Sequence, residues 1–240
     1  MAKKSARTLR QQAQQDLHAY EPPQVVTRYT AKPTPGPIEA LTENQARYLG
    51  AIKSQTIIFG TGPAGTGKTY CAAAWAADQL TAKRVEQIIL TRPAVETGQS
   101  MGFLPGTIEE KYAPFLEPFK STLVKRMGKG PFEYALKQQK ILPQPLAYMR
   151  GATFDNAVVL LDEAQNCTPQ EMLMFLTRIG DNCTVIVSGD IQQCDLRGPC
   201  GLEDAVKRLF NVPGVALVEF EEEDIVRSGI VKDVIRAYRN

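Results

Sequence analysis

Apolar runs and amphipathic stretches alternate from residue 56 to residue 238, and this alternation predicts strands and helices in turn. Residues 157–161 form an unbroken apolar run, which is typical of a parallel strand buried on both faces. Residues 169–179 instead carry apolar positions at helical spacing, and Gly180 is the expected end of that helix. The pattern predicts strands at 56–60, 87–91, 145–148, 157–161, 184–188 and 215–220, and helices at 68–81, 107–127, 131–138, 169–179, 201–210 and 229–238. This order indicates an α/β fold class with a mainly parallel sheet flanked by helices.

Capping side chains mark several of these boundaries. Thr168 and Glu171 form a capping box, with Pro169 at the first helical position. The same spacing recurs at two further places, which are Thr107 with Glu110 and Thr42 with Gln45. We therefore expect helices to begin at all three sites.

The first 37 residues differ in composition from the rest of the chain. The whole chain has 240 residues, 43% of them hydrophobic, and a net charge of only +2, which does not by itself indicate a nucleic-acid partner. Residues 1–37 hold a local charge of +4, and residues 21–37 contain five prolines. We predict a mobile arm at 1–37 and a globular domain at 38–240. A basic arm can bind a phosphate backbone or remain a solvated tail, and its composition leaves both open.

The cysteine pattern favours free thiols. The five cysteines include no Cys-x-x-Cys pair and the chain has one histidine, His18, so no zinc site is expected. Reduced cysteines in a cytoplasmic protein are the plain interpretation. Lys3 and Lys4 are followed by no apolar stretch, so neither a signal peptide nor a membrane span is predicted.

Residues 62–69 form a complete phosphate loop with the pattern Gly-x-x-x-x-Gly-Lys-Thr, between a predicted strand and a predicted helix. Its glycines let backbone N–H groups turn toward phosphate oxygens, and the N-terminus of the helix adds partial positive charge. Lys68 is expected to bind the β- and γ-phosphates, and the Thr69 hydroxyl to bind Mg²⁺. The predicted nucleotide-binding residues of the loop are Gly62, Pro63, Ala64, Gly65, Thr66, Gly67, Lys68 and Thr69.

Two carboxylates, Asp162 and Glu163, directly follow the apolar strand at 157–161. Open α/β sheets bind ligands at the carboxyl ends of their strands. We predict that Asp162 holds Mg²⁺, directly or through water. Glu163 is predicted to orient the attacking water and to accept its proton.

Further polar residues follow the strand at 184–188. The segment Gly-Asp-x-x-Gln at 189–193 matches the sensing motif of helicase-like ATPases, so Gln193 is predicted to sense the γ-phosphate from the side opposite Lys68. Asp190 is expected to hold this loop or the lytic water.

Gln45, shortly before the phosphate-loop strand, has two interpretations. Its amide can read adenine, as in superfamily 1 helicases, or it can cap a helix, and the sequence favours neither. The guanine-reading Asn-Lys-x-Asp tetrapeptide is absent, which favours ATP over GTP.

Two basic loops could meet a partner. Residues 92–106 form a loop too long for a simple connection, and Arg92, an aromatic residue and glycines there suit nucleic acid or a neighbouring subunit. Residues 148–151 provide a second basic loop on the same sheet edge.

The chain resembles the PhoH family of phosphate-starvation-inducible ATPases over about residues 40–238. The segments that carry the resemblance are 44–45, 62–69, 91–93, 102–106, 110–111, 147–151, 161–166, 174–178, 189–196 and 226–228. The resemblance implies a core like the N-terminal half of a superfamily 1 helicase, without a second motor domain. It also implies an ATPase of RNA metabolism that forms hexameric rings, and residues 1–37 lie outside it.

A core of this kind has no second domain to bring an arginine to the γ-phosphate, so we predict a homo-oligomeric ring with ATP bound between subunits. Arg227, in the family-like segment 224–228, is the predicted arginine, with Arg178 and Arg150 as alternatives. Arg227 acting within its own subunit remains open.

Three functions stay open. The first is a Mg²⁺-dependent ATPase coupled to binding or remodelling of RNA or single-stranded nucleic acid. The second is an ATP-dependent switch or scaffold with a protein partner. A small-molecule kinase is the weakest, because Glu163 suits water activation and no arginine-rich lid follows. The predicted cofactors are ATP and Mg²⁺, and the predicted catalytic residues are Lys68, Glu163, Gln193 and Arg227.

Overall fold

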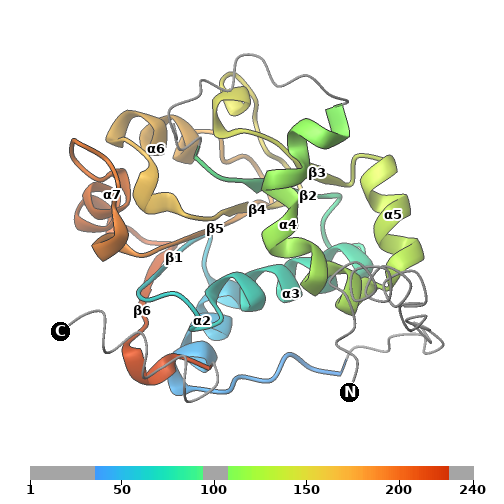
Figure 1. Cartoon of the computed structure of the whole chain (residues 1–240), viewed down its shortest axis with the longest axis horizontal. Helices are drawn as coiled ribbons and strands as arrows, with labels where there is room; N and C mark the ends of the chain where they lie inside the picture. Colours follow the sequence, from blue (N-terminus) through green and yellow to red (C-terminus); the bar gives the residue numbers. More distant parts are fainter. Residues whose placement is uncertain (1–35, 94–107, 227–240) are drawn as a thin grey trace, which may run out of the picture. The chain divides into compact units, whose positions relative to one another are not determined.

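The computed structural model describes residues 36–93 and 108–226 (Figure 1). Its centre is a six-stranded sheet in the order β3-β2-β4-β5-β1-β6, in which every neighbouring pair is parallel. The strands are β1 Ile57–Thr61, β2 Gln87–Thr91, β3 Ile141–Pro143, β4 Ala157–Leu161, β5 Thr184–Gly189 and β6 Val215–Glu219. The helices are α2 Glu43–Ser54, α3 Lys68–Thr81, α4 Ile108–Met127, α5 Lys129–Lys137, α6 Pro169–Leu176 and α7 Gly201–Leu209. The predicted fold class, a parallel sheet flanked by helices, is confirmed.

Helices cover both faces of the sheet, because alternate strand residues point to opposite faces. Ile58, Val158 and Ile186 face a core that α2, α3, α4 and α5 complete. Phe59 and Val159, each one position further along, face a second core completed by α6 and α7. Figure 1 shows α6 and α7 on one side of the sheet and α2, α3 and α4 on the other. Burial on both faces explains the unbroken apolar run of β4.

The strand order brings the polar strand ends together. β5 lies between β1 and β4, and β2 lies on the other side of β4. All four strands are parallel, so the segments after them leave from the same edge of the sheet. The phosphate loop after β1, the carboxylates after β4 and Asp190 after β5 therefore meet at that edge.

The strand predicted at 145–148 is wrong. The edge strand β3 lies earlier, and Leu146–Met149 form a 3₁₀ helix. Leu146 and Met149 are buried whereas Ala147 and Tyr148 between them are exposed. Burial at positions i and i+3 is a helical pattern, while a strand would bury alternate residues.

The helix predicted at 169–179 is shorter than expected. Its capping box forms as predicted, with Thr168 and Glu171 each bonding the backbone of the other, but the helix ends at Leu176. Ile179 leaves the helix and pairs with Phe154 in an isolated parallel bridge. Gly180 does not end the helix. A Cβ at this glycine would collide with the Asp155 carboxylate, so the close approach of Asp155 explains the residue.

The remaining boundaries agree with the prediction within one or two residues. The helix predicted at 229–238, most of the loop at 92–106, the arm at 1–37 up to residue 35 and Thr107 of the second capping box lie outside the described residues. The division into an arm and a domain therefore stays a prediction.

Candidate nucleotide-binding site

The phosphate loop connects β1 to α3 and bends as its glycines predict. Gly62, Gly65 and Gly67 have φ values of 127°, 86° and 84°, which residues other than glycine rarely adopt. A Cβ at Gly62 would also collide with the backbone carbonyl of Phe220 at the end of β6. Thr66 is fully buried, and its hydroxyl donates to the carbonyl of Pro63 at 3.1 Å. The loop is therefore braced by its own atoms and by the neighbouring strand.

Lys68 lies folded against this loop. Its Nζ donates to the carbonyl oxygens of Gly62 at 2.7 Å and Pro63 at 2.8 Å, and to the Thr66 hydroxyl at 3.2 Å. The ammonium also lies 5.7 Å from the centre of the Phe220 ring. Burial lowers the pKa of Lys68 to about 8, although nearby carboxylates, Asp190 first, act in the opposite direction. A phosphate must compete with two carbonyls for this ammonium.

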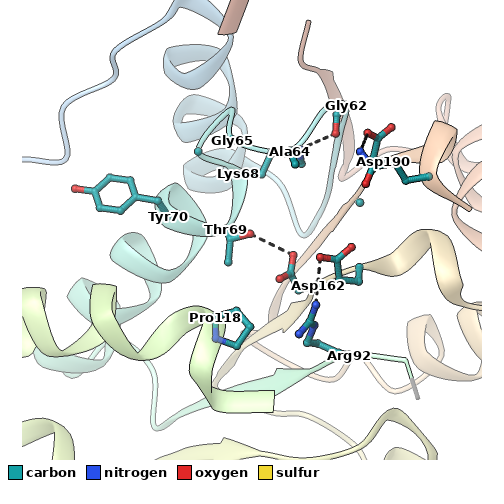
Figure 2. A pocket seen from close by; sticks show the side chains of 14 residues that line it. Gly62, Ala64, Gly65, Lys68, Thr69, Tyr70, Arg92, Pro118, Asp162 and Asp190 are labelled. Carbon is teal, nitrogen blue, oxygen red and sulfur yellow. Dashed lines mark hydrogen bonds and ion pairs between the residues drawn. The ribbon is translucent and has the colours of Figure 1, made fainter. Parts of the chain in front are cut away.

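Thr69 in α3 and Asp162, directly after β4, face each other. The Thr69 hydroxyl donates to Oδ1 of Asp162 at 3.2 Å (Figure 2). Burial raises the pKa of Asp162, and the adjacent Glu163 adds to the shift. A divalent cation would favour the ionised carboxylate. Hydroxyl and carboxylate oxygens this close fit the ligand preference of Mg²⁺.

Glu163 has an unusual backbone and two side-chain partners. Its φ of 54° places it in the left-handed region, which is uncommon for a residue with a side chain and is often seen at functional sites. Its Oε1 lies 3.2 Å from Nη2 of Arg92. Its Oε2 accepts a hydrogen bond from Nε2 of Gln165 at 2.7 Å. The carboxylate is thus held at the pocket wall.

Gln165, which the sequence pattern did not single out, contacts two of the candidate site residues. It is 2% exposed, and its Oε1 accepts from the backbone N–H of Asp190 at 3.1 Å. Its own carbonyl accepts from the thiols of Cys194 and Cys200 at 3.2 Å and 3.4 Å. Gln165 therefore links Glu163 to the loop after β5. A polar residue two positions after a carboxylate pair was a weak signal for this role.

Asp190 holds the loop that carries Gln193. Its Oδ1 accepts from the backbone N–H of Gln192 at 3.1 Å, and its Oδ2 from Nε2 of Gln193 at 2.8 Å. These contacts hold the loop, which is one of the two roles expected for Asp190, and the role toward the lytic water stays a prediction. Gln193 is exposed and its side chain is held at the pocket.

The phosphate loop, the two carboxylates and the loop after β5 line one pocket of about 410 Å³, within the size range of small-molecule sites. Predicted residues in its wall are Gly62, Ala64, Gly65, Gly67, Lys68, Thr69, Asp162, Glu163, Asp190 and Gln193. Residues in the wall that were not predicted are Tyr70, Arg92, Pro118 and Gly189. Figure 2 shows Arg92 and Pro118 on the side of the pocket away from the phosphate loop.

Gln45 lies behind the phosphate loop, 2% exposed. Thr42 caps α2 by accepting from the backbone N–H of Gln45 at 3.2 Å, as expected. The Gln45 side chain does not return to Thr42. Its Oε1 accepts from the N–H of Leu41 at 2.8 Å, and its Nε2 donates to the Thr66 carbonyl at 2.9 Å. Both ends of the amide are therefore engaged, one of them by the loop itself.

Of the three arginines predicted to act on the γ-phosphate, one lies outside the described residues and the other two lie away from the pocket lining. Arg227 lies just outside the described residues, and its neighbour Val226 donates from its backbone N–H to the Gly65 carbonyl at 3.1 Å. Arg150 is exposed and Arg178 half-buried, and neither lines the pocket.

The structure also bears on the cysteines and on the question of a membrane span. Cys71, Cys167, Cys183, Cys194 and Cys200 are all unpaired. Among the described residues, no helix combines the length and the apolar character needed to cross a membrane.

Comparison with known proteins places the chain in a family. Residues 37–239 match the family described as PhoH-like protein. PhoH of Escherichia coli K12 is 51% identical over 206 residues, which are 84% of this chain and 58% of that protein. The PhoH-like protein of Bacillus subtilis 168 is 45% identical over 203 residues, which are 84% of this chain and 64% of that protein. The chain thus spans about three fifths of the length of these relatives.

A search of solved structures found the Pif1 helicase of Candida albicans, at 14% identity and a TM-score of 0.42, over 85% of this chain and 44% of that one. This likeness is too low to support an inference. The sequence identities to the PhoH proteins are much higher, and together with the family match they show that the chain belongs to the PhoH family.

Proposed function

We propose that this protein binds ATP with Mg²⁺ and hydrolyses it by in-line attack of water, and that hydrolysis is coupled to RNA or single-stranded nucleic acid. One observation carries the ATPase part. The phosphate loop and the carboxylate pair line the same pocket, with the Thr69 hydroxyl 3.2 Å from Asp162. Binding of phosphate and activation of water need these two groups side by side.

The side chains divide the work. Lys68 leaves the Gly62 and Pro63 carbonyls to bind the β- and γ-phosphates. Thr69 and Asp162 hold Mg²⁺, which neutralises phosphate charge when bound. Glu163 accepts the proton of the attacking water. Gln193, held by Asp190, lines the same pocket and contacts the γ-phosphate.

Water activation favours an ATPase over a kinase. Glu163 is anchored on both carboxylate oxygens in the pocket wall, 43% exposed, where a water molecule can reach it. An acceptor hydroxyl of a kinase substrate could take the same position. The small-molecule kinase remains the weakest alternative because the sequence predicts no arginine-rich lid after the phosphate loop.

An exposed aromatic next to an exposed arginine supports the nucleic-acid part. Tyr148, in the 3₁₀ helix that follows β3, is 67% exposed, and Arg150, directly after that helix, is also exposed. Aromatic rings stack on bases and arginines bind phosphates in proteins that hold single strands. The alternative is an ATP-dependent switch or scaffold with a protein partner.

The rate of ATP hydrolysis with and without poly(U) tests this assignment. We expect stimulation by poly(U), and Tyr148→Ala should remove most of the stimulation while the basal rate stays unchanged. Tyr134→Ala is the matched control, because Tyr134 is 61% exposed on α5. A basal ATPase that no nucleic acid stimulates would favour the protein-partner switch. No hydrolysis at all would refute the ATPase.

We further propose a homo-oligomeric ring, hexameric by family resemblance, in which a neighbouring subunit brings an arginine to the γ-phosphate. Arg227 is the first candidate, and Arg178 and Arg150 follow. Mixing Glu163→Gln and Arg227→Ala proteins should restore activity at junctions that combine the intact residues. Light scattering that finds a fully active monomer with ATP and Mg²⁺ would refute the ring.

We also propose a cytoplasmic location, which the unpaired cysteines support.

A further inference from the structure

Arg92 is, among the described residues, the arginine that lines the phosphate pocket. It directly follows β2, which pairs with β4, and Glu163 lies just beyond the end of β4. Nη2 of Arg92 lies 3.2 Å from Oε1 of Glu163, and the two side chains are 30% and 43% exposed. The pair therefore lies in the pocket wall within reach of a bound ligand.

The two partners of Glu163 differ in burial and in their other contacts. Gln165 is 2% exposed, and its amide is also held by the backbone N–H of Asp190, so it is fixed in place. Arg92 has a long side chain that is one-third exposed and can move to another acceptor. Of the two contacts to Glu163, the one from Arg92 is the contact that a ligand can replace.

A γ-phosphate is a suitable competitor for this guanidinium. Arginine donates two parallel hydrogen bonds to carboxylates and to phosphates alike. Lys68, the residue proposed to bind the β- and γ-phosphates, lines the same pocket as Arg92, so a γ-phosphate held there enters the space that Arg92 also lines. A diphosphate ends one group short of that position.

We propose that Arg92 exchanges Glu163 for the γ-phosphate when a nucleoside triphosphate binds, so that Arg92 distinguishes a triphosphate from a diphosphate. The inference rests on the proposed function. The exchange frees Oε1 of Glu163 to accept the proton of water, while Gln165 still holds Oε2. Arg92 acts within its own subunit, and this role is separate from that of an arginine from a neighbour.

A binding experiment on the full chain tests the exchange without hydrolysis. Calorimetry with Mg²⁺ measures the affinity for the β,γ-imido analogue of ATP and for ADP. The decisive comparison is Glu163→Gln against Glu163→Gln with Arg92→Ala, because the first change removes both the base and the competing carboxylate.

In the Glu163→Gln background, Arg92→Ala should weaken binding of the triphosphate analogue by roughly tenfold or more, the loss expected for a hydrogen bond to a charged group. ADP affinity should not change. With Glu163 intact the loss should be smaller, since Arg92 must then first leave a partner. Arg92→Lys keeps the charge without the planar donors and should lose less than Arg92→Ala.

Arg208→Ala is the matched control, because Arg208 pairs with Asp204 on α7 outside the pocket. It should change neither affinity. A thermal melt checks folding, and Arg92→Gln replaces Arg92→Ala if the latter does not fold.

Unchanged affinity for the triphosphate analogue in the Glu163→Gln background, or an equal loss for ADP, would overturn the inference. A loss of poly(U) binding with unchanged nucleotide affinity would assign Arg92 to nucleic acid and would also overturn it. A wild-type protein that binds neither nucleotide would instead refute the proposed function. If the wild type binds and hydrolyses ATP but the Arg92 effect is missing, only the role of Arg92 is wrong.

Discussion

The two walls of the nucleotide pocket are built in opposite ways. The phosphate-loop wall is one continuous segment, 62–69, whose shape comes from glycine backbone and from bonds within the loop. The carboxylate wall is assembled from three strand ends, with Arg92 after β2, Glu163 after β4 and Asp190 after β5. Its members are connected by side-chain hydrogen bonds and an ion pair.

The difference indicates a division of labour. A loop whose backbone is already bent into place can bind phosphates without changing its conformation. A wall of side chains that share partners can exchange them, which suits proton transfer and the response to a γ-phosphate. We therefore expect changes in the phosphate loop to alter nucleotide affinity in general. In the carboxylate wall, changes at Glu163 and Gln165 should alter turnover, and a change at Arg92 should alter affinity for the triphosphate alone.

The largest effect should come from Glu163→Gln. The amide cannot accept the proton of water, so turnover should fall by about 10²–10⁴ while ATP binding is retained. Phosphate release and calorimetry measure the two quantities. Glu203→Gln on the surface of α7 is the control. Hydrolysis at the wild-type rate would show that another group is the base.

Lys68→Ala should reduce nucleotide affinity by roughly 10- to 100-fold, since a hydrogen-bonded charge on the phosphates is lost. Calorimetry with ATP analogue and Mg²⁺ measures the loss, and Lys129→Ala on the surface is the control. If affinity is unchanged and only turnover falls, the division between the walls is wrong on the binding side.

Nucleotide affinity should also depend on pH through Lys68. Burial lowers the pKa of Lys68 to about 8. The amine loses its charge above that value, so affinity should fall as pH rises, approaching about tenfold per pH unit. Between this pKa and the ordinary value of 10.5 the unfolded chain binds more protons, so the same group makes the free energy of unfolding rise with pH. A pH profile that is the same in Lys68→Ala would contradict this assignment.

Gln165→Leu should lower kcat by about tenfold and leave KM unchanged, because Glu163 and the Asp190 backbone each lose a hydrogen-bond partner. Steady-state kinetics separates the two constants. Gln170→Leu on the exposed face of α6 is the matched control. An increase in KM with unchanged kcat would place Gln165 in binding and remove the contrast between the walls.

The smallest effect should come from Gln45→Ala, which removes the brace between α2 and the Thr66 carbonyl. We expect the free energy of unfolding to fall by about 1 kcal/mol with the preference for ATP over GTP unchanged. A thermal melt and a competition assay measure both. Loss of the ATP preference in a stable protein would instead assign adenine reading to Gln45.

Local patterns made much of the protein predictable. The phosphate loop, the capping box at Thr168 and the buried strand β4 depend on residues close in sequence, and all three are found where they were expected. The sequence pattern predicted the wrong position for the edge strand and for the end of α6. Leu146, Met149 and Ile179 owe their conformation to packing against distant elements, which the local pattern does not contain.

The sequence by itself determined the fold class, the family and the bend of the phosphate loop. The bend was predictable because a contiguous segment with glycines at the right positions carries its own geometry. Only the tertiary structure decided which side chains face that loop. The order β2-β4-β5-β1 brings Arg92 to Glu163 and Gln165 to Asp190, and no spacing along the chain encodes those neighbours. Gln45 illustrates the same limit. Its amide had two possible roles in the sequence, and the folded chain directs it to Thr66 because α2 packs behind the loop.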